Sequence, residues 1–159
     1  MNTSVTSAAP APSPAGLVGW VDRVYGCLGR VPYGLLAVPL RLAVAVVFWN
    51  SARAHLANMD TTLALFEDEY KVPLLPPDFA AHLTVAIEVS APILLVLGLA
   101  TRPVALVLLG MTFVIEAFVY PQAWPTHIQW VAMMLVLLCR GPGALSLDHL
   151  IQRWAHRRR

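Results

Sequence analysis

The sequence predicts an all-α fold: an integral membrane four-helix bundle with a short interfacial helix at each end. Three observations favour this class. Hydrophobic residues make up 58% of the 159 residues and charged residues only 13%, which is too apolar for a soluble domain of this size. The apolar residues form long runs separated by short polar connections. The run 79–100 would reach ~33 Å as a helix at ~1.5 Å per residue, enough to cross a hydrocarbon core of ~30 Å.

The two ends of the chain differ in composition from these runs. Residues 1–16 are rich in Ala, Pro and Ser and carry no charged side chain, so we expect a disordered tail. Apolar residues over 17–33 then recur at helical spacing among charged ones, which indicates an interfacial amphipathic helix. Residues 141–159 are expected to restart a helix at Ser146 and end in a basic tail, typical of an anchor on an anionic leaflet.

The bundle itself is expected over 34–140. We place the four spans at 34–57, 79–100, 104–120 and 126–139. Thr101–Pro103 would form the tight turn between the second and third spans, and Thr126 with Gln129 has the spacing of a capping box. With four spans, most basic residues of the short loops fall on one side, which predicts a bacterial inner membrane protein with both termini in the cytoplasm.

Polar residues in the outer half of the spans are the candidate site. A carboxylate at mid-membrane costs ~2.5–3.5 kcal/mol on insertion scales, so Glu88 is a functional candidate by default. Counted at ~1.5 Å per residue from the expected turn, Glu88 and Glu116 both lie ~18–20 Å away, and His127 reaches a similar height. Asn50 and Arg53 share one helical face near the same level. We therefore predict one polar layer.

This layer allows two interpretations. In the structural one, Arg53 neutralises one carboxylate, the other is protonated or paired with His127, and the network only fixes the helix register. In the functional one, Glu88, Glu116 and His127 are catalytic groups that exchange protons with a bound ligand, and Asn50 and Arg53 bind and orient it.

Other classes of site have less support. His55 and Met59, at i and i+4, are the only candidates for a metal site, one that would suit a soft metal such as copper. Cys27 and Cys139 form no CxxC motif, which argues against a disulfide or dithiol site. The arginines do not form a basic face with stacking aromatics, so nucleic acid is not an expected partner.

Four stretches together resemble the DoxX family of small four-span bacterial membrane proteins. These stretches, within about residues 38–150, are RLAVAVVFWNSARAHL, IEVSAPILLVLGLATR, FVYPQAWPTHIQW and RGPGALSLD. The resemblance makes Glu88 the carboxylate of the second span and His127 part of a WPTH motif. The founding member of this family resembles a subunit of a thiosulfate:quinone oxidoreductase, and others accompany redox or oxidative-stress proteins. The last two stretches are most similar to members found beside small copper-binding peptide systems.

The resemblance implies a membrane subunit of a redox or metal-stress system. We expect a quinone-like ligand in the polar layer and a partner protein that supplies electrons, so the chain would be at most a subunit of a quinone-linked oxidoreductase. The alternative is a non-catalytic anchor or accessory protein for a copper-handling partner. A transporter is a third option, which would require a homo-oligomer.

Overall fold

The structure of the protein, a computed structural model, describes residues 16–158, so the tail expected over 1–16 lies outside the described residues except for Gly16. The chain divides into two compact units, Met1–Val31 and Pro32–Arg159. The first unit contains helix α1 (Leu17–Leu28), which has apolar side chains such as Trp20 and Tyr25 exposed. Exposed aromatics beside charged residues suit a helix that lies in a membrane interface.

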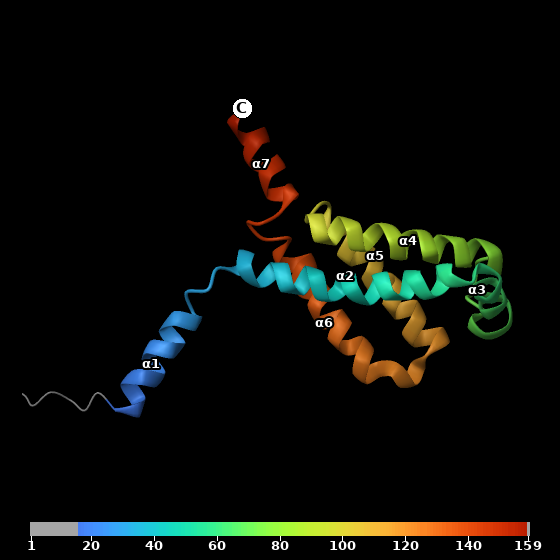
Figure 1. The fold of residues 1–159 in the computed structure, drawn as a ribbon, viewed down its shortest axis with the longest axis horizontal. Helices are drawn as coiled ribbons and strands as arrows, with labels where there is room; N and C mark the ends of the chain where they lie inside the picture. Colours follow the sequence, from blue (N-terminus) through green and yellow to red (C-terminus); the bar gives the residue numbers. More distant parts are fainter. Residues whose placement is uncertain (1–15, 159) are drawn as a thin grey trace, which may run out of the picture. The chain divides into compact units, whose positions relative to one another are not determined.

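The second unit is built from helices alone within the described residues, which confirms the all-α fold class (Figure 1). In order, its elements are α2 (Tyr33–Ala57), α3 (Met59–Leu65), η1 (Phe66–Tyr70), α4 (Pro77–Leu97), α5 (Thr101–Val114), η2 (Ile115–Val119), η3 (Pro121–Ala123), α6 (Trp124–Arg140) and α7 (Leu147–Arg157). Three stretches are long and apolar enough to cross a membrane: Tyr33–Ala57, Pro77–Leu97 and Thr101–Val119. The fourth bundle helix, α6, is shorter at 17 residues.

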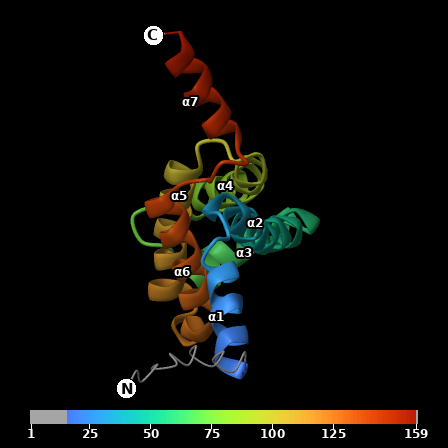
Figure 2. The same cartoon turned by 90° about the vertical axis from the view of Figure 1, so that its left-hand side faces the viewer.

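Helices α2, α4, α5 and α6 pack into one bundle. The most extensive contacts join α2 to α4 and α5 to α6, and smaller ones join α2 to α6 and α4 to α5 (Figures 1 and 2). The core has large apolar side chains such as Leu95, Leu108 and Leu137, each fully buried, and small ones such as Ala105. Many other Leu and Val side chains on these helices are exposed, as expected where lipid replaces water as the solvent.

The turn between α4 and α5 differs from the sequence prediction. We expected it at Thr101–Pro103, but α4 ends at Leu97 and α5 already begins at Thr101. Gly98 causes this, because it adopts φ +65° and its amide and that of Leu99 bond back to the last carbonyls of α4, which is a glycine C-cap. Pro103 then lies in the first turn of α5, where a proline is tolerated.

The segment after α6 folds back onto this turn. The Asp148 carboxylate accepts hydrogen bonds from the amides of Ala100, at 2.9 Å, and Thr101, at 3.1 Å, and so caps the start of α5. The Ser146 hydroxyl caps α7 by accepting from the amide of His149. The capping box expected at Thr126 and Gln129 is wrong, because α6 begins at Trp124 without a side-chain cap.

Arg41 is a charged residue buried at one end of α2. The residue is only 3% exposed. Its Nη2 donates a 2.6 Å hydrogen bond to the carbonyl of Leu145. The reason is tertiary: residues 141–146 cover this end of α2, so the arginine is enclosed by protein and binds a backbone carbonyl.

Candidate functional site

A cavity of about 360 Å³ lies inside the bundle. Helices α2, α4, α5 and α6 form its walls, and η1 and η2 contribute residues near its polar groups. Most of its lining is apolar, with Phe48 and Trp130 in aromatic contact at 6.0 Å between ring centroids. The polar lining residues are few: Ser51, His55, Tyr70, Thr84, Glu88, Tyr120 and His127. An apolar cavity with a few converging polar groups is the usual form of a small-molecule site.

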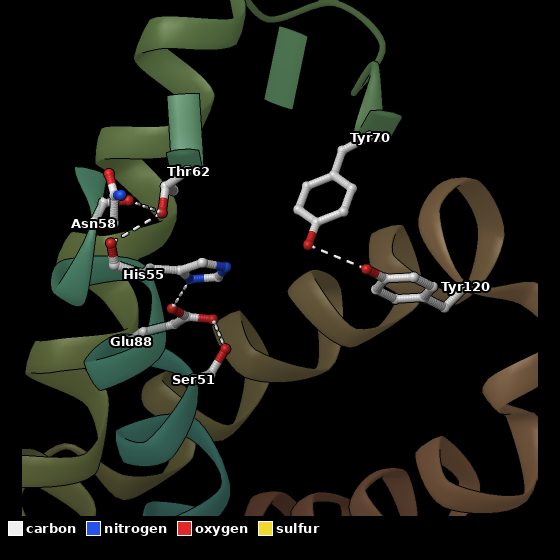
Figure 3. A network of polar contacts seen from close by, with 7 residues as sticks. All are labelled: Ser51, His55, Asn58, Thr62, Tyr70, Glu88 and Tyr120. Carbon is white, nitrogen blue, oxygen red and sulfur yellow. Dashed lines mark hydrogen bonds and ion pairs between the residues drawn. The ribbon is translucent and has the colours of Figure 1, made fainter. Parts of the chain in front are cut away.

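Glu88 is held by two side chains of α2 (Figure 3). The Ser51 hydroxyl donates a 2.7 Å hydrogen bond to its Oε1, and the Nδ1 atom of His55 lies 2.7 Å from its Oε2. The Glu88 residue is 1% exposed, whereas the His55 side chain keeps 16% of its surface accessible. The carboxylate is therefore enclosed, and His55 is the more accessible member of the pair.

The corner between α2 and α3 fixes the position of His55. Thr62 donates from its hydroxyl to the carbonyls of His55, at 2.9 Å, and Asn58, at 3.1 Å (Figure 3). The Asn58 side chain caps α3 by accepting from the amide of Thr61. The ring of Phe66 packs edge-on against His55 with centroids 6.3 Å apart. These contacts restrain both the backbone and the ring of this histidine.

A second histidine and carboxylate pair comes from α6 and η2. The Nδ1 atom of His127 contacts Oε2 of Glu116, and the two side chains are 5% and 20% exposed. His127 lines the cavity and packs against Trp130, with ring centroids 4.8 Å apart. Glu116 is not a lining residue and reaches the cavity only through His127. Two histidine and carboxylate pairs, one from α2 and α4 and one from η2 and α6, therefore serve one cavity.

Asn50 and Arg53 do not join this layer. Both are exposed on α2, and neither lines the cavity. The helical geometry explains this, since Arg53 lies two residues from both Ser51 and His55 and so ~160° away from each around the helix. The sequence placed these two residues at the correct end of the span but on the wrong face.

Ser51 and His55 are the site residues that sequence reasoning missed as partners of Glu88. His55 had been considered only as a copper ligand with Met59, whereas its Nδ1 is engaged by Glu88 and Met59 packs near Phe66 and Ala80. The signal was their spacing of four residues, which continues the buried stripe of Val44 and Phe48. Among residues 16–158, no group of three or more His, Cys, Asp or Glu side chains could hold a metal ion.

Two tyrosines meet beside the cavity. The hydroxyls of Tyr70, at the end of η1, and Tyr120, after η2, lie 3.2 Å apart, and their rings stack edge-on at 5.8 Å (Figure 3). Both η segments are π-helical, a form that often occurs at functional sites. Burial raises the pKa of the Tyr70 phenol above its usual range, and the hydrogen bond to Tyr120 adds to this. Tyr70 therefore stays protonated at physiological pH.

The Tyr70 phenol is expected to titrate well above ~10, the ordinary tyrosine value. Because the folded chain holds this proton more tightly than the unfolded chain, its contribution to stability is present below ~10 and is lost as pH rises further. The measurement is the rise in tyrosinate absorbance with pH. Subtracting the curve of Tyr70→Phe from that of the wild type isolates Tyr70, and subtracting the curve of Tyr25→Phe gives the same difference for an exposed tyrosine as the control. A Tyr70 difference curve centred at the ordinary value would contradict the burial seen here.

The fold and the cavity define a helical, multi-pass membrane protein with an internal polar site. The family model described as DoxX matches residues 36–121, more than half of the chain. The chain belongs to the DoxX family. The matched residues include Ser51, His55, Glu88 and Glu116, while His127 lies just beyond them.

One curated relative is itself of unknown activity. An uncharacterized protein of Haemophilus influenzae is 28% identical over 133 residues, which cover 76% of this chain and 85% of that protein. No solved structure matches the chain. The comparisons thus show the family, and the chemistry of the cavity follows from its own residues.

Proposed function

We propose that this chain is the membrane subunit of a redox or metal-stress system and that its cavity binds a quinone-like ligand. The observation that carries the proposal is the pair of histidine and carboxylate groups, His55 with Glu88 and His127 with Glu116, that serve one largely apolar cavity. An apolar cavity opening among membrane helices suits a ligand that dissolves in the bilayer.

The proton chemistry matches a quinone. Reduction of a quinone to a quinol takes two electrons and two protons, one proton for each carbonyl oxygen. Each histidine and carboxylate pair can hold one proton and release it, which is general acid and base catalysis. The electrons would come from a partner redox protein. Ser51 keeps the Glu88 carboxylate in place by its 2.7 Å hydrogen bond and thereby orients His55.

The surrounding assignments belong to the same proposal. We place the chain in the bacterial inner membrane with both termini in the cytoplasm and the cavity toward the outer leaflet. Residues 34–140 would form the spanning bundle, 17–33 an interfacial helix, and 141–159 a basic amphipathic tail on the cytoplasmic leaflet. Exposed Leu150, Ile151 and Trp154 on α7, near Arg153 and Arg157, support the last of these.

Binding of a short-chain quinone analogue to the purified full chain tests the proposal. We expect quenching of the tryptophan fluorescence, because Trp130 lines the cavity. His127→Ala should weaken binding about tenfold or more, by loss of one hydrogen bond to an otherwise buried polar group. The matched control is Arg53→Gln, an exposed residue at the same end of α2, which should bind as the wild type does.

Two outcomes would contradict the proposal. The first is equal binding by wild type and His127→Ala. The second concerns the copper-handling alternative: copper sensitivity of the host that depends on His55 and Met59 but not on Glu88 would show that His55 acts on copper rather than in proton exchange with Glu88.

A further inference from the structure

The end of the bundle opposite the cavity contains a basic pocket. It has a volume of about 520 Å³ and lies between the start of α5, the end of α6 and the start of α7. Arg102, Arg140 and His149 contribute its basic side chains. Arg102 donates from Nη2 to the carbonyl of Cys139 at 3.3 Å, which positions its guanidinium at the end of α6. Arg140 lies over the Tyr33 ring, 5.4 Å from its centroid, in cation–π geometry.

One carboxylate, that of Asp148, also lines this pocket. Its two oxygens already accept the amides of Ala100 and Thr101, so it does not pair with either arginine. The charge of the pocket is therefore positive, by two arginines against one aspartate, and it increases when His149 is protonated. Guanidinium groups bind phosphate oxygens through paired N–H donors.

An apolar groove begins at the same arginine. It has a volume of about 460 Å³ and runs between α2 and α6, lined by Tyr33, Leu36, Leu40, Leu135, Val136, Cys139 and Arg140. From Tyr33 to Leu40 it extends ~10 Å along the helix axis, toward the middle of the bundle. Arg140 is the residue common to the groove and the basic pocket.

We infer that this end of the bundle is a binding site for one anionic phospholipid. Its phosphate lies between Arg102 and Arg140, and the first part of one acyl chain lies in the groove between α2 and α6. A free phosphate would use only the basic pocket, and a lipid without a phosphate would use only the groove. In a zwitterionic phospholipid such as phosphatidylcholine, the choline cation would be repelled by the two arginines. The site joins both at Arg140, and basic pockets among membrane helices are typical headgroup sites.

The test is native mass spectrometry of the full chain in a non-ionic detergent with phosphatidylglycerol or phosphatidylcholine of identical acyl chains. We expect the wild type to retain one phosphatidylglycerol in preference to phosphatidylcholine. Arg102→Gln with Arg140→Gln should weaken this binding by roughly fivefold for each arginine lost. The matched control, Arg53→Gln with Lys71→Gln, removes the same charge from exposed residues that line neither hollow and should keep the preference.

A second variant tests the groove without changing charge. Val136→Trp would fill it and should reduce retention of both lipids, with helicity by circular dichroism confirming the fold. The inference is overturned if the double arginine variant keeps its preference, if the matched control variant loses as much, or if Val136→Trp has no effect. Displacement of the lipid by millimolar inorganic phosphate alone would also overturn it, because the site would then be one for a free anion.

Discussion

Glu88→Gln is expected to preserve the fold but abolish proton exchange at the α2 and α4 side of the cavity. Glutamine has nearly the same shape, and its carbonyl oxygen can still accept the hydroxyl of Ser51, which is 2.7 Å from Oε1 in the wild type. Its amide cannot hold the proton that a carboxylate shares with His55. If the pair acts as a general acid and base, the rate of partner-driven quinone reduction should fall by ~100-fold to 10,000-fold.

Glu88→Ala should behave differently. It leaves both Ser51 and His55 without their acceptor in a place where Glu88 is 1% exposed, and loss of one partner from a buried pair costs ~3–5 kcal/mol. We therefore expect Glu88→Ala to lower thermal stability in detergent clearly, and Glu88→Gln to lower it much less. Equal rates for wild type and Glu88→Gln in a folded protein would show that the pair only fixes the helix register.

Gly98→Ala is expected to be among the most destabilising single substitutions in the bundle. A Cβ atom there would lie 1.9 Å from Nη1 of Arg41 and 2.5 Å from Cβ of Ser146. The residue also has φ +65°, a conformation that costs a residue with a side chain ~1–2 kcal/mol. Because the displaced Arg41 would lose its bond to Leu145, we expect a total loss of about 3 kcal/mol or more.

The measurement is unfolding of the purified chain in a denaturing detergent titration. Gly110→Ala serves as the matched control, since an added Cβ there meets nothing within 4 Å. Inside α5 that change should be neutral or stabilising by up to ~1 kcal/mol. Similar losses of stability for the two alanine variants would mean that the segment after α6 does not pack against Gly98 at the turn between α4 and α5.

The sequence was sufficient to predict the class of fold and to select polar groups that the structure brings together. Charge and hydropathy identify the spans, and the rise per residue is constant, so counting along the spans predicted Glu88, Glu116 and His127 near one level. The structure brings Glu88 and His127 to one cavity and pairs Glu116 with His127. Height along a helix depends on chain length alone, which the sequence contains.

The rotation of each helix could not be predicted in the same way. In α2, apolar residues face both the core and the surface: Val44 is buried, whereas Val46 and Leu42 are exposed. In a soluble helix the polar face marks the outside, but in a bilayer this contrast is lost. That is why Arg53 was predicted in the site and Ser51 was not.

The closing segment was also beyond sequence reasoning. The stretch GPGALSLD reads as a helix break and restart, and nothing local shows that it returns to the α4 turn. In the structure Asp148 caps α5, and Gly143, at φ +81°, approaches Gly34 and Ala37 so closely that a Cβ would meet them at 2.9 Å. These are contacts between residues far apart in the chain, which no local pattern encodes.

Native mass spectrometry of the complex released from its own membrane in mild detergent tests the central claim most directly, comparing wild type with Glu88→Gln. The proposal predicts a bound quinone in the wild type, with a clear loss of it in the variant. Two results would contradict it. In one, wild type and Glu88→Gln both carry only phospholipid. In the other, both carry copper and a partner protein to the same extent.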